Sequence, residues 1–427
     1  MFWVYNVLLT LLSPVWVPWM LWRAKRRAEN VNWQERQGNL ILALGPGSER
    51  IWFHAVSVGE VVAALPILRG IRERNPELEI VLSVTTSSGH ETARNQAEGL
   101  FDQLVYLPID VVRFTLNAMA RVEPKAVVVM ETELWFNFFW AAKTVGAEVL
   151  VVNGRVSDRS FPKSSKLGFF YRPLLAMVDE VLVQSETDRE RFVSLGANSA
   201  EVLGNCKFDQ ALEGVDADAA KWRGELGIPA DAFVVVIGST RGEIEEEFVV
   251  TALNDERLSD VWVVHAPRHM ETVPGLVNRV DGAFGGVARR SKGESGRYLI
   301  LDSYGELSQV YSVADVVVIG GGFDRLGGQN LMQPLAHGKP VIHGPHMMNF
   351  RDSAEMADRV GATLTVESAD GLRGALIELM NDPGKRARMG KAAADLVAGN
   401  RGASDRYADR IVAAVGRAKG APRRSRS

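Results

Sequence analysis

Short apolar segments alternate with stretches of helical periodicity along most of this chain, and this alternation restricts the folds it can adopt. One series of segments runs from Arg50 to about Gly204, and a second begins after a stretch around residues 212–218. Strands that alternate with helices form parallel sheets covered by helices. The expected strands are residues 51–54, 79–84, 103–107, 126–130, 148–152 and 180–184 in the first series, and residues 233–237, 261–265, 298–301, 316–319 and 340–343 in the second.

The chain of 427 residues is longer than one hydrophobic core usually supports, so each series is expected to form its own domain. We therefore predict an α/β fold of two doubly wound, Rossmann-like domains that face a cleft. The predicted divisions are residues 1–22 for an N-terminal membrane anchor, 23–210 for the first domain, 211–415 for the second domain and 416–427 for a basic tail.

The composition argues against several functional classes. The net charge of −3 provides no general attraction to nucleic acid, so we expect no nucleic-acid partner. The single cysteine, Cys206, excludes an intramolecular disulfide and any multi-cysteine metal site. The seven histidines do not follow the HExxH spacing of zinc enzymes, so no metal site is indicated.

The first 22 residues carry no charged side chain, and their aromatic residues lie toward the two ends. Such a segment is long enough to cross a bilayer as a helix, with its aromatics at the interfaces. The basic residues that follow directly are Arg23, Lys25, Arg26 and Arg27. They predict that the rest of the chain lies on the cytoplasmic side. Pro14 and Pro18 weaken a regular helix and leave open a segment that lies in the membrane interface.

The segment HAVSVGE, residues 54–60, lies between the strand at 51–54 and a helical pattern at 61–73. Ser57, Gly59 and Glu60 are therefore expected in a strand-to-helix turn. In an open parallel sheet, ligands bind at the carboxyl ends of the strands. Glu60 is either a general base there or an acidic residue that stabilises the helix start by about 0.3–1 kcal/mol.

A second acidic segment, METELW at residues 130–135, follows the strand at 126–130. Two carboxylates just beyond a buried strand usually bind a polar ligand or pair with a basic side chain. Alternatively, one of Glu131 and Glu133 stabilises the start of a helix expected from Leu134.

A cationic segment, NGRVSDRS at residues 153–160, follows the next strand and precedes Lys163, Lys166 and Arg172. Aromatic residues at 161 and 169–171 lie among these charges. Basic side chains beside aromatics suit a phosphorylated amphiphile or a membrane surface. A solvated loop and helix face is the alternative.

The second series carries small and basic residues after its strands. Gly238, Ser239 and Thr240 are expected in a turn before a helix at 243–250, where a phosphate can bind. Arg268 follows the next strand as a possible anion contact. Paired glycines at 320–322 and 327–328, then Asn330, precede a helix with Gln333. Glycines at successive strand ends favour a nucleotide-sugar pocket, since they let backbone N–H groups approach a ligand.

Together these segments resemble the bacterial 3-deoxy-D-manno-oct-2-ulosonic acid (Kdo) transferases. The matching pieces are the N-terminal segment, HAVSVGE, METELW, NGRVSDRS, the Gly-Ser-Thr turn, Pro267-Arg268-His269, GGFDRLGGQN and GPHMMNF. The resemblance implies the two-domain GT-B fold, with the acceptor in the first domain and the donor in the second. It also implies an inverting glycosyltransferase at the inner membrane that moves Kdo from CMP-Kdo to lipid A precursor (lipid IVA) in lipopolysaccharide core biosynthesis. No metal or other cofactor is implied.

The resemblance also assigns roles to individual residues. Glu60 takes the place of the general base that accepts the proton of the attacking hydroxyl group. The positions implied to bind the acceptor are Ser57, Gly59, Glu131, Arg155, Ser157 and Ser160. Those implied to bind the donor are Ser239, Thr240, Arg268, Gly327, Gly328, Asn330 and Gln333.

The chain departs from the family pattern on the donor side. Gln329 stands in place of a histidine, Gln333 in place of an acidic residue, and Arg241 where the family often has histidine. An amide accepts a ribose hydroxyl without the charge assistance of a carboxylate, so we predict weaker or altered donor use. The alternatives are a GT-B transferase with another nucleotide-sugar donor and a non-catalytic membrane-bound binding protein. A sugar-nucleotide epimerase of similar fold has no use for a membrane anchor.

Overall fold

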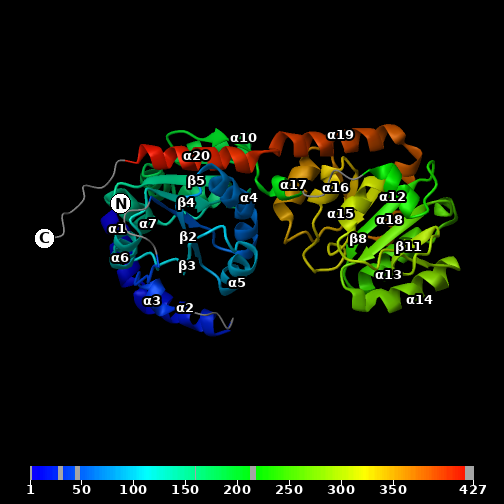
Figure 1. The fold of residues 1–427 in the computed structure, drawn as a ribbon, viewed down its shortest axis with the longest axis horizontal. Coiled ribbons are helices and arrows are strands. Elements are labelled where there is room, and N and C mark those ends of the chain that lie inside the picture. The colour runs from blue at the N-terminus through cyan, green and yellow to red at the C-terminus, as the bar shows by residue number, and fades with distance from the viewer. Residues whose placement is uncertain (1, 27–31, 44–48, 159, 212–217, 419–427) are drawn as a thin grey trace. The chain divides into compact units, whose positions relative to one another are not determined.

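The chain forms two compact units, and each is described here by itself (Figure 1). The computed structural model describes residues 2–26, 32–43, 49–158, 160–211 and 218–418. The first unit comprises Met1–Gln210 and Asn400–Ser427, and the second comprises Ala211–Gly399. Arg27 and most of the predicted basic tail, residues 419–427, lie outside the described residues.

The first unit is built on a seven-stranded parallel sheet with the order β3-β2-β1-β4-β5-β6-β7. Its strands are β1 (Arg50–His54), β2 (Glu79–Val84), β3 (Gln103–Tyr106), β4 (Ala126–Met130), β5 (Glu148–Gly154), β6 (Glu180–Val183) and β7 (Glu201–Val202). Its helices are α1 (Phe2–Leu11), α2 (Ser13–Arg26), α3 (Trp33–Arg36), α4 (Val58–Arg74), α5 (Ser87–Gln96), α6 (Val112–Val122), α7 (Phe136–Thr144), α8 (Phe161–Lys166), α9 (Gly168–Leu175), α10 (Glu186–Leu195), α11 (Lys207–Ala211) and α20 (Ala403–Arg417).

Alternate residues of the central strand β1 face opposite sides of the sheet. Ile51 and Phe53 pack into a core shared with α4 and α20, whereas Trp52 packs into a core shared with α6 and α7. All three side chains are fully buried. Both faces of the strand are apolar because helices cover both faces of the sheet, as expected for a doubly wound fold.

The C-terminal helix α20 belongs to the first unit, so the prediction that the second domain extends to residue 415 is wrong. It packs along α4, as the red ribbon in Figure 1 shows. The fully buried Tyr407 donates its hydroxyl proton toward the carbonyl oxygens of Gly204, at 2.7 Å, and Val183, at 3.2 Å. Arg74 of α4 also pairs with Asp405 and Asp409 of α20. The helix continues to Arg417, so residues 416 and 417 are not part of a tail.

The N-terminal segment is not the single anchor helix that the sequence predicted. It forms two helices, α1 and α2, bent by 66° where they meet. Pro14, the second residue of α2, has no N–H group to continue the hydrogen-bond ladder of α1. Within the described parts of the chain, no single helix has the length and apolarity to cross a membrane, and only this bent pair meets those criteria jointly.

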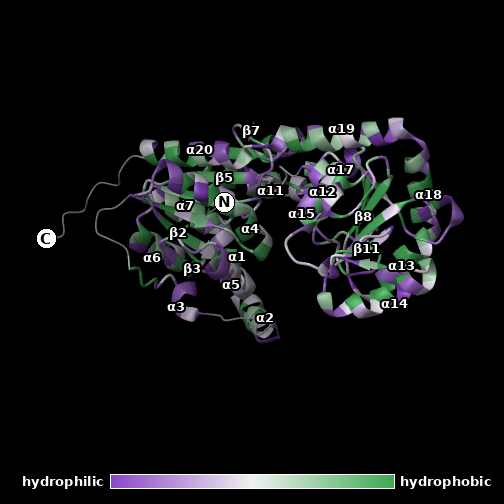
Figure 2. Ribbon diagram, turned by 45° about the vertical axis from the view of Figure 1, so that its right-hand side comes forward, coloured by the Kyte–Doolittle hydropathy of each residue, from purple (hydrophilic) through white to green (hydrophobic). Residues whose placement is uncertain are grey.

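The second unit is built on another seven-stranded parallel sheet, with the order β10-β11-β9-β8-β12-β13-β14. Its strands are β8 (Val234–Thr240), β9 (Trp262–Pro267), β10 (Ala288–Arg289), β11 (Tyr298–Ile300), β12 (Val316–Ile319), β13 (Val341–His343) and β14 (Thr363–Thr365). Its α-helices are α12 (Ala219–Glu225), α13 (Gly242–Leu253), α14 (Val273–Phe284), α15 (Leu307–Val310), α16 (Met332–Ala336), α17 (Arg351–Arg359), α18 (Ala369–Asn381) and α19 (Pro383–Asn400). Figure 2 shows the hydrophobic colouring of β8 at the centre of this sheet.

Two differences from the predicted elements matter for function. The strand β8 continues through Gly238, Ser239 and Thr240, so these residues end a strand and do not form a separate turn. The short edge strands β7, β10 and β14 were not predicted, because two or three residues are too few to show a periodicity.

Candidate functional site

Most of the predicted site residues follow the two strands between which the strand order of each sheet reverses direction. In the first sheet this point lies between β1 and β4, and in the second it lies between β8 and β12. Ligands of open α/β sheets bind outside the carboxyl ends of the strands at such a switch point. Glu60 and Glu131 follow β1 and β4, whereas Arg241 and Gly320 follow β8 and β12.

Glu60 lies in the first turn of α4, for which Ser57 is the N-cap residue. Its Oε2 atom accepts a hydrogen bond from the Val56 N–H group at 2.9 Å, and its Oε1 atom accepts one from the Ser57 hydroxyl at 3.3 Å. The neighbouring Gly59 is exposed and has open space where a side chain would be. A ligand can therefore reach the N-terminus of α4 at Gly59.

The electrostatic surroundings of Glu60 favour its neutral form. Burial raises its pKa most, and the negative charges of Glu131 and Glu133 raise it further, to about 8. The hydrogen bonds from Val56 and Ser57 act in the opposite direction. A carboxylate with a pKa near neutrality can accept a proton and later release it, which is the property of a general base.

Glu131 pairs with Lys207, a residue that the sequence analysis missed. The Lys207 Nζ atom lies 2.8 Å from Glu131 Oε1, and both side chains are half-buried. The backbone of Glu131 has a positive φ of 55°, and its N–H group donates to the Val152 carbonyl at 3.0 Å. The expectation that a carboxylate here pairs with a basic side chain is confirmed for Glu131. For Glu133, burial raises the pKa most, while a hydrogen bond from Trp135 lowers it.

The C-terminal segment of the chain holds the loop that carries Lys207. The Asn205 N–H group donates to the Asn400 side chain at 2.7 Å, and Asp209 accepts N–H groups from Gly402 at 2.6 Å and Ser404 at 2.7 Å. Lys207 lies between these two fixed points. No motif marked Lys207, which lies shortly after Gly204, where the first series of segments ends.

The predicted acceptor loop at residues 155–160 is tied to the same edge of the sheet. The Thr132 hydroxyl donates to the carbonyl oxygen of Arg155. Ser157 and Ser160 hydrogen-bond each other through their Oγ atoms at 2.8 Å, and Ser160 is exposed. Residue 159 of the predicted motif lies outside the described residues.

In the second unit, the structure separates Ser239 from Thr240. Ser239 is half-buried and has a positive φ of 60°. Thr240 is fully buried, and its Oγ1 atom lies 2.8 Å from Nε2 of the buried His265. Thr240 therefore supports the strand end, whereas Ser239 is partly accessible to solvent. Arg268 is exposed, and its N–H group donates to the Thr240 carbonyl at 2.9 Å.

The glycines of the second unit allow loops to pack against one another. A Cβ atom on Gly327 would lie 2.3 Å from Asn349 Nδ2, and one on Gly328 would lie 2.5 Å from the sulfur of Met347. Both glycines also have positive φ angles, 94° and 80°. Close packing between strand-end loops thus explains these glycines without a ligand. The backbone N–H of Gly328 is already bonded to the Gly321 carbonyl at 2.6 Å.

The other two predicted donor residues lie beside the short helix α16. Asn330 is exposed, and its side-chain oxygen accepts the N–H group of Met332 at 2.9 Å. Gln333 is half-buried within α16. Within the described ranges, no group of three or more histidine, cysteine or carboxylate side chains is placed to hold a metal ion.

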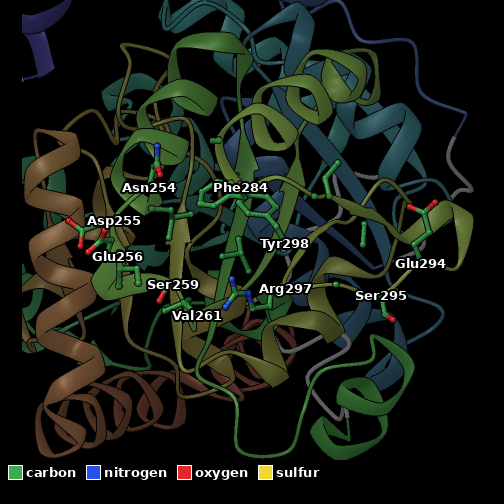
Figure 3. A pocket seen from close by; sticks show the side chains of 18 residues that line it. Asn254, Asp255, Glu256, Ser259, Val261, Phe284, Glu294, Ser295, Arg297 and Tyr298 are labelled. Atoms are coloured by element: carbon green, nitrogen blue, oxygen red, sulfur yellow. The ribbon is translucent and has the colours of Figure 1, made fainter.

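A cavity of about 700 Å³ lies at the opposite edge of the second sheet (Figure 3). Its lining includes Phe284 at the end of α14, Gly286 just after it, Val261 before β9 and Tyr298 at the start of β11. These positions are at the amino ends of the strands, where no predicted donor residue lies. The cavity is therefore separate from the switch point.

The sequence matches the family described as 3-deoxy-D-manno-octulosonic-acid transferase (kdotransferase) over residues 31–210. It is 34% identical to the 3-deoxy-D-manno-octulosonic acid transferase of Bordetella pertussis, with 96% of this chain and 98% of that protein covered. It is 31% identical to the protein of the same name from Chlamydophila psittaci, with 80% of each covered.

Two solved structures share the two-sheet architecture. MurG of Acinetobacter baumannii superposes with a TM-score of 0.59 at 13% identity, over 86% of this chain and 99% of that one. The UDP-GlcNAc 2-epimerase of Neisseria meningitidis bound to UDP-GlcNAc superposes with a TM-score of 0.54 at 13% identity, over 86% and 100%. These likenesses support the predicted GT-B fold.

Proposed function

The chain belongs to the 3-deoxy-D-manno-octulosonic acid transferase family, and from this premise we propose that it transfers Kdo from CMP-Kdo to a lipid A precursor in lipopolysaccharide synthesis. It is a glycosyltransferase and not the non-catalytic binding protein that was the alternative. The observation that carries the proposed mechanism is Glu60, a carboxylate with a raised pKa at the β1/β4 switch point.

In the proposed reaction, a hydroxyl oxygen of the acceptor attacks the anomeric carbon of Kdo. The bond between that carbon and the phosphate oxygen of CMP breaks, so CMP leaves and the configuration inverts. Glu60 accepts the proton of the attacking hydroxyl. Its raised pKa makes it a stronger base than an ordinary carboxylate once it is ionised.

The Glu131–Lys207 pair is proposed to adjust the charge beside this base. Glu131 repels the negative form of Glu60, and Lys207 at 2.8 Å offsets that charge. The half-buried Glu131 is also within the proposed acceptor-binding edge, together with Arg155, Ser157 and Ser160. A phosphorylated sugar lipid offers hydroxyls and phosphates that match carboxylate, hydroxyl and guanidinium groups.

On the donor side, the proposal uses side chains that the structure leaves exposed or half-buried. Arg268, which is exposed, and Ser239, which is half-buried, are proposed to contact the phosphate of CMP, where the charge of Arg268 would offset the charge of the leaving group. Asn330 and Gln333 are proposed to contact sugar hydroxyls. Because Gln333 replaces a carboxylate, a GT-B transferase with another nucleotide-sugar donor is the second candidate.

The bent helix pair is proposed to hold the enzyme on the cytoplasmic side of the inner membrane, within the interface. Asn6 of α1 pairs with Asn137 through two amide hydrogen bonds of 2.9 and 2.8 Å, which fixes α1 on the first unit. The pair also exposes large apolar residues, namely Trp3, Val4, Val7, Leu8, Leu11, Leu12, Val15, Trp19, Leu21 and Trp22. A helix that packs on the protein with one face and exposes apolar residues on another suits a position in the membrane interface without crossing the bilayer.

The basic end of α2 supports this placement. Arg23 lies over the ring of Trp19, and Arg26 lies over the ring of Trp22, at 5.5 and 5.4 Å. In such arginine–tryptophan pairs, the guanidinium group lies at the level of the lipid head groups and the indole ring lies just below that level. Phe169 of α9 is 66% exposed and adds a further apolar contact on the first unit.

Transfer can be tested with purified protein in detergent, given lipid A precursor and a system that generates CMP-Kdo. Wild type is compared with E60A and with E73Q, which changes an exposed glutamate on the same helix. Product from wild type and E73Q but not from E60A would support both the reaction and the base. Intact CMP binding without product from any of the three would contradict the Kdo donor.

A further inference from the structure

We propose that Glu245 is a positioning residue of the donor site, which ties the two strand-end loops of the β8/β12 switch point together. The inference rests on the proposed donor function of these loops. Neither the sequence motifs nor the family resemblance singled out this residue. It would act through the backbone and would not touch the donor itself, because its side chain is fully buried.

The carboxylate of Glu245 accepts four backbone N–H groups. Its Oε2 atom accepts from Arg241 at 2.8 Å and from Gly321 at 2.6 Å. Its Oε1 atom accepts from Phe323 at 3.0 Å and from Asp324 at 3.4 Å. The first N–H belongs to the loop after β8, and the other three belong to the loop after β12.

The carboxylate of Glu245 is buried without a basic partner, so it depends on the backbone N–H groups of the two loops. In the part of the chain that the structure describes, no basic side chain forms an ion pair with Glu245. A buried carboxylate is unfavourable unless hydrogen bonds compensate the lost hydration. Here the compensation comes wholly from the loops, so their conformation and the buried charge depend on each other.

Each loop carries predicted donor residues close to the point that Glu245 holds. Arg241 directly follows Ser239 and Thr240, and a Cβ atom on Gly320 would lie 2.5 Å from Thr240 Cα. Gly321 accepts the N–H group of Gly328 at 2.6 Å. Loss of the carboxylate would therefore loosen both halves of the proposed donor site at once.

The face of α13 that carries Glu245 makes a second contact with the same loop. Phe248, one helical turn later, stacks on Phe323 with ring centroids 4.6 Å apart. The two contacts fix residues 321–324 against the helix. They also show that the N–H groups of Gly321, Phe323 and Asp324 are already occupied, so the donor phosphate must bind to other groups.

Glu246 provides a matched control, because it is the next residue and is equally buried. Its Oε2 atom accepts from Arg279 Nη1 at 3.0 Å, and it makes no hydrogen bond to either loop among the described residues. E246Q therefore removes a buried charge from the same helix without releasing the loops.

The test compares wild type, E245Q and E246Q for CMP binding by calorimetry, for the KM of each substrate and for thermal stability. The amide in E245Q has a single accepting oxygen, so it cannot accept all four N–H groups, and its NH2 group then faces backbone N–H donors. We expect E245Q to weaken CMP binding and to raise the donor KM about tenfold, with the acceptor KM unchanged, as for a loss of roughly 1.4 kcal/mol. Amide exchange at Gly321 and Phe323 should become faster in E245Q alone.

Equal effects of E245Q and E246Q on CMP binding, or an equal rise in the acceptor KM, would overturn the proposal. If E245Q does not fold, E245D retains the charge but shortens the reach, and the same donor-specific loss is expected. Failure of the proposed function would look different, since wild type would then make no product and would not bind CMP. In that case, amide exchange at Gly321 and Phe323 still shows whether Glu245 holds the loops. The binding comparison between wild type, E245Q and E246Q is then made with a nucleotide that wild type does bind.

Discussion

The pH dependence of transfer should report the charge balance around Glu60. Its pKa is raised from an ordinary 4.5 to about 8, so only about one tenth of the base is ionised at pH 7 and about nine tenths at pH 9. At saturating donor, we expect the acceptor kcat/KM to rise about tenfold over this range, with a midpoint near pH 8.

Two variants should move this midpoint in opposite directions. E131Q removes the negative charge that raises the pKa of Glu60, so the midpoint should fall, although burial keeps it above 4.5. K207M leaves Glu131 without its partner at 2.8 Å, so the midpoint should rise. The shape of the pH profile is compared, and not the absolute rate, because Glu131 belongs to the proposed acceptor-binding edge and Lys207 pairs with it.

The assay is initial-rate transfer from CMP-Kdo to lipid A precursor in detergent between pH 5.5 and 9.5, with E73Q as the control for an exposed glutamate on α4. A wild-type midpoint below pH 6 would refute the raised pKa of Glu60. A midpoint that shifts in the same direction for E131Q and K207M would refute the charge balance.

Three further changes test other parts of the structure. E60Q should raise the Tm at pH 8 and have little effect at pH 5. Because folding raises the pKa of Glu60, the folded protein loses stability as the pH rises from 4.5 through 8, and the amide removes that loss. A Tm that falls at pH 8 would contradict this explanation. Q333E should lower the donor KM, and an unchanged KM would remove Gln333 as the cause of weaker donor use. Y407A should lower the free energy of unfolding of the first unit by about 3–5 kcal/mol, measured by denaturant unfolding. Y407F should lower it by about 1 kcal/mol, because the hydrogen bond to Gly204 is lost. An unchanged free energy of unfolding in Y407A would contradict the placement of α20.

The central elements of both sheets could be predicted because their signals are local. Continuous apolar runs such as residues 126–130 match β4, since strands buried on both faces need apolar residues at every position. The helix after β1 could likewise be predicted from the spacing of Val61, Leu65 and Leu68, which are all buried in α4. Its start at Val58 lies three residues before the predicted pattern.

The candidate site could be predicted in part. The motif HAVSVGE placed Glu60 at a strand end, and METELW placed Glu131 at another, but only the strand order β2-β1-β4 makes them neighbours. The roles of the predicted site residues stay predictions. For Thr240, the fully buried side chain and its bond to His265 point to support of the strand end, which its position beside Ser239 did not reveal.

The sequence by itself determined the two α/β domains, the family and the strand ends that carry polar residues, because periodicity and short motifs are properties of neighbouring positions. The tertiary structure alone decided three long-range matters. Lys207 pairs with Glu131, 76 positions earlier in the sequence. Glu245 accepts a hydrogen bond from Gly321, 76 positions later. Tyr407 of α20 donates a hydrogen bond to Gly204, 203 positions earlier. Each depends on where the sheet order brings distant loops together, and the fully buried Glu245 and Tyr407 need hydrogen-bond partners because they have lost contact with water.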